Sequence, residues 1–314
     1  MTRAWGRHSC LRNAAHSSSN CARSKIATFA ALFLLFAALT ALAQDAKHYQ
    51  ARGVVLRVDR AKKSAYISTD AIPGFMEAMA MSYEAKNPAE LAPLVPGTII
   101  DFTLSVTPDT SYIENIKVRD FESVEQDPLA ARRLKLLDQI DSAGAATKLI
   151  ERGQHVPDFT LTDQSGQAVT LSAFAGKVVV VSFMYTRCAL PNYCFRLSNN
   201  LARLQKRFHD ELGRDLILLS VTFDPAHDQP AQLADYAKIW KADPQWWHML
   251  TGPAADVQSV CREFGVVAYP DEGLLIHSLH TVIIDRQGNL AANLEGNEFT
   301  ATQLGDLVET VIQR

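Results

Sequence analysis

The apolar residues of this chain follow two different periods along its length. Between residues 48 and 120, short runs alternate apolar and polar side chains and are separated by turn formers such as Pro96-Gly97. A period of two is typical of half-buried β-strands. Four or five strands in so short a region predict a small all-β barrel of the five-stranded, OB-like kind. The expected strands read YQARGVVLRVD, SAYIST, TIIDFTLSV and SYIENIKV.

Residues 153–314 instead alternate strand and helix patterns. The run KVVVVSFMY is continuously apolar, which is typical of a central strand buried on both faces. Leu197, Leu201, Leu204 and Phe208 recur at helical spacing after it, and DLILLSVTFD, PAQLADYAKIW and HTVIID continue the alternation. This order predicts an α/β sheet. Residues 121–152, charged and rich in helix formers, predict a helical linker between the two regions.

The first 43 residues form a leader. Basic residues are followed by an apolar run of 18 residues, 26–43, which ends in Ala41-Leu42-Ala43. That pattern predicts a secretory signal peptide. The run also reaches the lower length limit for a membrane anchor, so both alternatives stand. In either case the charge asymmetry places the rest of the chain outside the cytoplasm, in the periplasm, either soluble after cleavage or anchored in the inner membrane.

Composition and cysteine count narrow the function classes. The net charge is −3, and no basic stripe interleaved with aromatic residues is present, so we expect no nucleic-acid partner. Of five cysteines, Cys10 and Cys21 belong to the leader. Cys261 shares a helical spacing with Val257 and Phe264, which predicts a buried structural residue. Only Cys188 and Cys194 need a chemical explanation.

These two cysteines follow the central strand, in the segment FMYTRCALPNYC. Pro191 predicts that a helix starts near residue 191, which places Cys188 beside a helix N-terminus, where a thiolate is stabilised. Three readings compete at this stage: a structural disulfide, a redox dithiol and a metal site. A metal site needs further ligands, and His277 and His280 lie at the entrance of a later strand. Two thiolates and one imidazole suit copper.

The barrel region carries a second group of soft donors. Met76, Met79 and Met81 lie together, and the last two share one face if they lie on a strand. Methionine often simply fills a small core, but thioethers also bind Cu(I). The segment resembles the CusF-like periplasmic copper-binding domains, whose motif joins Met-x-Met to an upstream Trp and His. Met76 stands in place of that Trp, and Ser68 or Thr69 stands in place of that His.

The C-terminal region resembles the Sco/SenC family over about residues 155–314. The matching segments are FMYTRC with its second cysteine, SVTFDPAHDQP, and IHSLHTVIIDRQG. The resemblance implies a thioredoxin-like domain that binds copper, as Cu(I), Cu(II) or both, through Cys188, Cys194 and His277 rather than His280. One departure is that the family's usual pair is Cys-x3-Cys, whereas this chain has Cys-x5-Cys. The longer loop could favour disulfide exchange over metal holding.

Together these observations predict an extracytoplasmic metallochaperone and thiol–disulfide protein with four parts. These are a leader at 1–43, a CusF-like barrel at 48–120, a linker at 121–152 and a Sco-like domain at 153–314. The resemblance implies that the copper acceptor is the cytochrome c oxidase subunit carrying the Cu-A centre, or another acceptor, and that a thiol reductant regenerates the cysteines. Two alternatives remain: a thiol–disulfide oxidoreductase or thiol peroxidase using Cys188, and a protein that only scavenges copper.

Overall fold

The computed structural model describes residues 46–119, 149–188, 193–271 and 274–314. The predicted leader and nearly all of the predicted helical linker lie outside these residues. Within the described ranges, no helix is both long enough and apolar enough to cross a membrane.

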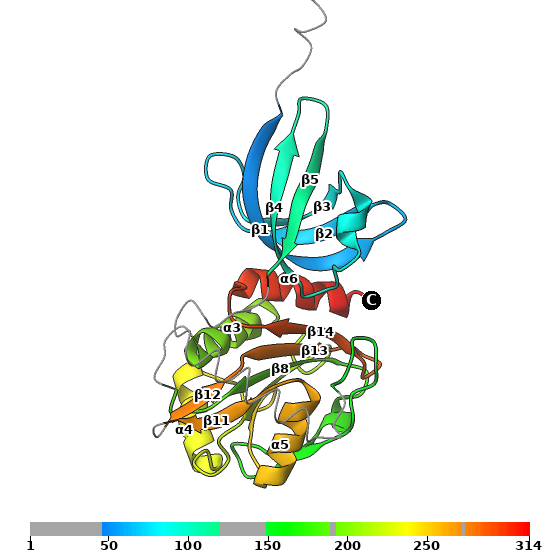
Figure 1. Ribbon diagram of the computed structural model, residues 1–314. Helices are drawn as coiled ribbons and strands as arrows, with labels where there is room; N and C mark the ends of the chain where they lie inside the picture. The colour runs from blue at the N-terminus through cyan, green and yellow to red at the C-terminus, as the bar shows by residue number, and fades with distance from the viewer. Residues whose placement is uncertain (1–45, 120–148, 189–192, 272–273) are drawn as a thin grey trace, which may run out of the picture. The chain divides into compact units, whose positions relative to one another are not determined.

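The N-terminal region forms a five-stranded sheet in the order β3-β2-β1-β4-β5 (Figure 1). A bridge between Ala85 and Ile113 joins the end of β3 to β5, so the outer strands meet. The four strands expected from the alternating pattern are all present, and the methionine segment supplies the fifth. The strands are β1 (Lys47–Asp59), β2 (Ser64–Thr69), β3 (Met79–Glu84), β4 (Ile99–Val106) and β5 (Ser111–Val118), with a 3-10 turn, η1 (Pro88–Leu91).

The barrel interior is a single apolar cluster. Val55, Ile67, Ile100 and Ile113 each have no exposed surface and pack together there. Gly53 lies on β1 opposite Thr69 of β2, and a Cβ atom at this position would come within 2.6 Å of Ile67 Cγ2. Only glycine therefore permits this close approach of the two strands.

The C-terminal region contains a mixed five-stranded sheet in the order β10-β9-β8-β13-β14 (Figure 1). Strands β8, β9 and β10 run parallel, whereas β13 is antiparallel to both β8 and β14. Two small sheets accompany it, β6-β7 and β11-β12. The sheet strands are β8 (Val178–Met184), β9 (Leu216–Thr222), β10 (Trp247–Leu250), β13 (His280–Ile284) and β14 (Leu290–Glu295); the others are β6 (Thr160–Thr162), β7 (Ala168–Thr170), β11 (Ala268–Asp271) and β12 (Leu274–His277).

Helices cover both faces of this sheet. All of β8 is buried, as its unbroken apolar run predicts. Its residues alternate between two clusters: one includes buried residues of α3, α4 and α6, and the other includes buried residues of α5 and the β6-β7 hairpin. The α/β prediction is therefore confirmed. The helices are α3 (Cys194–Arg207), α4 (Pro230–Trp240), α5 (Ala254–Glu263) and α6 (Ala301–Ile312), with a 3-10 turn, η3 (Leu171–Phe174).

The helix start expected near Pro191 is wrong. Helix α3 begins at Cys194, because the preceding Tyr193 has φ −107° and ψ −113°, outside the helical region. The residue at the helix N-terminus is therefore Cys194 and not Cys188. The apolar face of α3 is as expected, since Leu197, Leu201 and Leu204 have no exposed surface.

Candidate metal centre

Three soft donors meet at one end of the C-terminal sheet. The ligand atoms of Cys188, Cys194 and His277 all lie within 4.8 Å of one another. In the part of the chain that the structure describes, no other group of three or more His, Cys, Asp or Glu side chains comes together in this way. Both cysteines are present as thiols, and all three residues are buried. The donor set is two sulfur atoms and one nitrogen atom.

Each donor is positioned by a different element. Cys188 lies in the turn after β8, where its backbone N–H donates to the carbonyl oxygen of Tyr185 over 3.3 Å. Cys194 is the first residue of α3, and His277 is the last residue of β12, opposite Ala268 of β11. Residues distant in the sequence therefore converge because β8 and β12 end, and α3 begins, at the same place.

The imidazole of His277 is oriented toward the sulfur atoms. Its Nε2 lies 3.9 Å from Cys194 Sγ, and its Nδ1 lies 3.0 Å from the carbonyl oxygen of Ser278. A carbonyl oxygen only accepts, so the proton belongs on Nδ1. The lone pair of Nε2 then faces the cysteines. This arrangement, with one ring nitrogen tied to a carbonyl and the other open, is typical of metal-binding histidines.

Aromatic rings surround this imidazole. The ring centres of Phe223, Tyr185 and Tyr193 lie 4.6, 5.5 and 6.0 Å from that of His277. Sequence reasoning did not single out these rings; the available signal was that Tyr193 directly precedes Cys194 and that Tyr185 and Phe223 each follow a buried strand. The imidazole is therefore buried among aromatic side chains.

Burial determines the protonation state of the Cys194 thiol at the start of α3. It raises the pKa of Cys194 well above its ordinary value, and the adjacent Cys188 raises it further. Burial also raises the pKa of Tyr185 to about 12, with Cys188 as the next cause. A thiolate at Cys194 therefore needs a positive charge beside it, and a bound metal cation supplies one.

Two other residues singled out by the sequence lie away from the three donors. His280 begins β13, and its Nδ1 lies 2.9 Å from Asn293 Oδ1 rather than near a cysteine. Cys261 is buried on α5 within the other apolar cluster, where burial raises the pKa of its thiol to about 12. The structural interpretation of Cys261 is consistent with this environment.

The barrel methionines divide into two environments. Met79 and Met81 lie on β3 opposite Thr69 and Ile67, so the pair shares one face of the sheet, as expected. The side chain of Met79 is 47% exposed, whereas Met81 is partly buried against the barrel core. Met76 is also partly buried there, and its sulfur lies 4.0 Å from the Tyr83 hydroxyl. Metal binding by these three methionines stays a prediction.

The pairing of β2 with β3 distinguishes the two positions considered for the missing histidine. Thr69 pairs with Met79 and shares its face, whereas Ser68 pairs with Ala80 on the opposite face. The Thr69 hydroxyl lies 3.0 Å from that of Tyr83. Thr69 is therefore the position that faces the methionines, and it offers a hydroxyl where the related domains have an imidazole.

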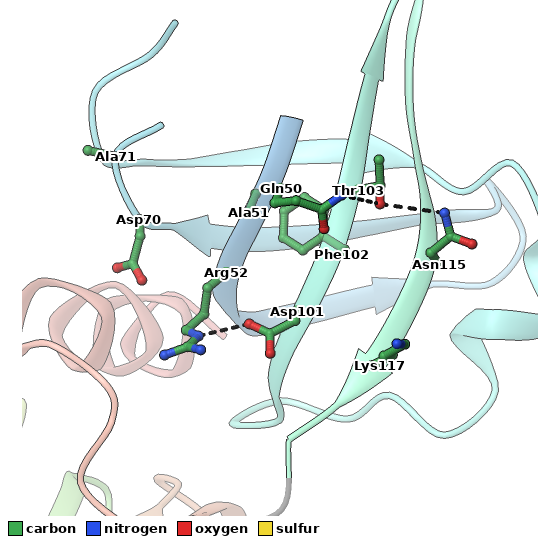
Figure 2. A pocket seen from close by; sticks show the side chains of 10 residues that line it. All are labelled: Gln50, Ala51, Arg52, Asp70, Ala71, Asp101, Phe102, Thr103, Asn115 and Lys117. Carbon is green, nitrogen blue, oxygen red and sulfur yellow. Dashed lines mark hydrogen bonds and ion pairs between the residues drawn. The ribbon is translucent and has the colours of Figure 1, made fainter. Parts of the chain in front are cut away.

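A polar cavity of about 680 Å³ opens elsewhere on the barrel (Figure 2). Arg52 Nε donates to Asp101 Oδ1 over 2.8 Å, and Gln50 Nε2 donates to Thr103 Oγ1 over 3.1 Å. No residue that lines the cavity carries a thiol, thioether or imidazole, so it lacks the donors that a soft metal prefers. The lining residues are Gln50, Ala51, Arg52, Asp70, Ala71, Asp101, Phe102, Thr103, Asn115 and Lys117.

Two known families match the two regions of the chain. The SCO1/SenC family model matches residues 147–313, and the model of the copper binding periplasmic protein CusF matches residues 48–118. The first match contains all three convergent donors. The second contains the five strands of the barrel except the first residue of β1.

The chain is also similar to individual proteins. The SCO1 protein homolog of Bacillus subtilis is 28% identical over 152 residues, which cover 46% of this chain and 76% of that protein. A protein of Stutzerimonas stutzeri whose name proposes copper binding is 28% identical over 171 residues, 53% of this chain and 79% of that protein. A solved SCO1/SenC family lipoprotein of Bacillus anthracis is 25% identical, with a TM-score of 0.46, over 52% of this chain and 99% of that one.

The placement of the two histidines generates a direct prediction. His277→Ala removes the nitrogen donor and should weaken Cu(I) binding by more than the roughly 100-fold seen when outer partners of a ligand are lost. His280→Ala leaves all three donors in place and should change the affinity by less than about tenfold. Competition with a Cu(I) chelator measures both values. Normal binding by the His277 variant together with failure of the His280 variant would reverse the assignment.

Proposed function

Because the chain belongs to the SCO1/SenC family, we propose that it is an extracytoplasmic copper carrier and thiol–disulfide protein that assists assembly of the Cu-A centre of cytochrome c oxidase. The observation that supports this function best is the convergence of Cys188, Cys194 and His277. Copper is the cargo of this protein rather than a resident cofactor. The copper-binding name of the second matching family and of one relative supports the same metal.

The three donors suit copper in the reduced protein. Thiolate sulfur and imidazole nitrogen are both ligands of copper, and two sulfurs with one nitrogen form a trigonal set. Nε2 of His277 already faces Cys194 Sγ, so binding needs no change of tautomer. The burial of all three donors leaves little room for water to compete as a ligand.

Release follows from oxidation of the same two thiols. When a disulfide of a partner protein accepts two electrons from Cys188 and Cys194, their sulfurs form one S–S bond and the partner gains two thiols. The oxidised pair no longer offers thiolates, and copper loses two of its three ligands. A thiol reductant then reverses the exchange and restores the site. The copper acceptor in this scheme is the oxidase subunit that carries Cu-A, or another copper-binding protein.

The barrel is a second copper-binding domain in this proposal. We divide the chain into a CusF-like domain at 48–120, a helical linker at 121–152 and a Sco-like domain at 153–314. Met79 and Met81, with Met76 beside them, hold Cu(I) through thioethers. The leader at 1–43 and the periplasmic name of the matching family support a periplasmic location, with membrane association if the leader stays uncleaved.

A thiol enzyme is the second candidate function. The observation that favours it is the pair of adjacent thiols in an α/β domain. Cys188 would attack a disulfide or a peroxide, with Cys194 as the resolving thiol. Such an enzyme needs thiolate reactivity but no imidazole ligand. A protein that only scavenges copper, without exchanging disulfides, is the third.

Metal analysis separates these functions. The reduced, purified chain should bind Cu(I), and the Cys188→Ser/Cys194→Ser double variant should lose about one equivalent per chain because two of three ligands are gone. The Cys261→Ser variant, which alters a thiol of the other apolar cluster, is the matched control and should retain its copper. Absence of copper in the unaltered chain, with disulfide or peroxide turnover that survives His277→Ala, would establish the enzyme instead.

The raised pKa of Cys194 predicts a pH dependence of copper binding. The thiol is protonated at neutral pH because burial raises its pKa, so binding as a thiolate releases a proton. The apparent affinity for Cu(I) should therefore rise with pH between 6 and 8, by about tenfold per pH unit for each proton released. Chelator competition at several pH values measures the slope. The double-serine variant should show no such slope at this site, and a flat profile in the unaltered chain would contradict the prediction.

Conservative changes in the barrel test its thioether site. Met79→Leu and Met81→Leu keep volume and apolarity, so each should cost less than about 1.5 kcal/mol in the free energy of unfolding. A thioether site predicts that the pair of changes nevertheless removes Cu(I) binding from the Cys188→Ser/Cys194→Ser background. Selectivity for Cu(I) over Cu(II) should accompany that binding, because Ser68 and Thr69 supply no imidazole. Identical titrations before and after the leucine changes would show that these methionines bind no copper.

A further inference from the structure

A fully buried carboxylate lies beside the metal centre without belonging to it. Asp228 has no exposed surface, and its two oxygens accept three hydrogen bonds. The backbone N–H of Thr186 donates over 3.0 Å, and the hydroxyls of Thr186 and Thr222 each donate over 2.5 Å. Burying a carboxylate is costly unless its hydrogen bonds are made. Its presence here therefore points to a role that an apolar residue could not fill.

This carboxylate joins three segments at one end of the sheet. Thr222 is the last residue of β9, Thr186 follows the end of the parallel strand β8, and Asp228 precedes α4 by two residues. Because β8 and β9 are adjacent, their ends lie within reach of one carboxylate. Asp228 thus ties the turn after β8 to the end of β9.

These hydrogen bonds to Asp228, called the Asp228 tie below, restrain the turn that carries Cys188. Thr186 uses both its backbone N–H and its side chain in bonds to Asp228, which restrains its backbone and its rotamer together. The next residue, Arg187, donates from its guanidinium to Asp224 over 2.7 Å. Each of the two residues before Cys188 is therefore held by an aspartate from the segment between β9 and α4.

Cys188 needs such a support more than the other two donors. Cys194 is part of α3 and His277 is part of β12, so regular backbone hydrogen bonding positions both. Cys188 follows β8 in a turn, where its position depends on local contacts. A donor misplaced by as little as 1 Å weakens a preorganised site.

We propose that Asp228 is a positioning residue for Cys188, acting through Thr186, with Asp224 and Arg187 as an outer clamp on the same turn. The tie keeps the sulfur of Cys188 buried beside Cys194 and His277 in the metal-free protein. The inference rests on the proposed function for its effect on copper, but the geometry of the turn can be tested without copper. Breaking the tie should weaken Cu(I) binding by about 10- to 100-fold, the usual effect of losing an outer partner of a ligand.

The test uses Thr186→Val, which keeps the shape of the side chain and removes one hydrogen bond to Asp228. Alkylation of the metal-free, reduced chain is followed at each cysteine by mass spectrometry. Cys188 is 4% exposed and Cys261 is 6% exposed, so both should react slowly in the unaltered chain. In the variant, Cys188 should react roughly tenfold faster or more, the effect expected when a hydrogen bond to a charged group is lost. Cys261 should not change.

Two further variants serve as controls. Thr186→Ser retains the hydroxyl and should restore both slow alkylation of Cys188 and copper affinity. Thr281→Val makes the same chemical change at a fully buried position of β13, where the hydroxyl has no hydrogen-bond partner among the described residues, and should alter neither quantity. Asp228→Asn, which replaces one acceptor oxygen by a donor, should behave like Thr186→Val if it folds.

The outcomes separate this inference from the proposed function. Selective exposure of Cys188 supports the positioning role even if the unaltered chain binds no Cu(I), a result that would refute the proposed function alone. Equal acceleration at Cys188, Cys194 and Cys261 would mean that Thr186 only stabilises the fold, and would overturn the inference. Unchanged alkylation and unchanged Cu(I) affinity in Thr186→Val would overturn it as well.

Discussion

The burial of β8 on both faces is the constraint on which the candidate site depends. All seven residues of this strand are buried, because helices cover one face of the sheet and α5 with the β6-β7 hairpin covers the other. The chain can turn only where the strand ends, and that turn carries Cys188. Helix α3 then starts with Cys194, and the β11-β12 hairpin brings His277 to the same edge. The three donors therefore meet because β8 and β12 end at the same edge of the domain, where α3 begins.

The low polarity of this edge decides what the thiols can do. Burial favours the neutral thiol at Cys194, so the site gains little from an isolated thiolate and much from a thiolate paired with a cation. A nucleophilic cysteine usually depends on the opposite environment, in which positive charge or a helix N-terminus lowers the pKa of the thiol. Cys194 does lie at a helix N-terminus, but desolvation dominates there. A bound metal cation therefore stabilises the thiolate of Cys194 where the helix N-terminus alone does not.

Local patterns predicted the fold well, and the site only in part. The apolar run at 178–184 and the helical spacing at 230–240 depend on short-range periodicity, and both elements appear as expected. The choice of His277 over His280 came from a family resemblance, since spacing alone fits either residue. The ring of Phe223 and the carboxylate of Asp228 reach the site through strand pairing and long-range hydrogen bonds, which no local pattern encodes. The predicted helix start was three residues early, because α3 begins at Cys194 after the non-helical backbone of Tyr193; Pro191 itself lies outside the described residues.

The coordination of copper in the Met79→Leu/Met81→Leu chain tests the account most directly, because this variant reports on the C-terminal donors alone. X-ray absorption of the reduced, Cu(I)-loaded protein distinguishes sulfur from nitrogen neighbours. The account predicts two sulfur ligands and one imidazole nitrogen, with the nitrogen signal lost in His277→Ala and kept in His280→Ala. A copper ion bound by sulfur alone, or a nitrogen signal that survives His277→Ala, would contradict the proposed three-donor centre.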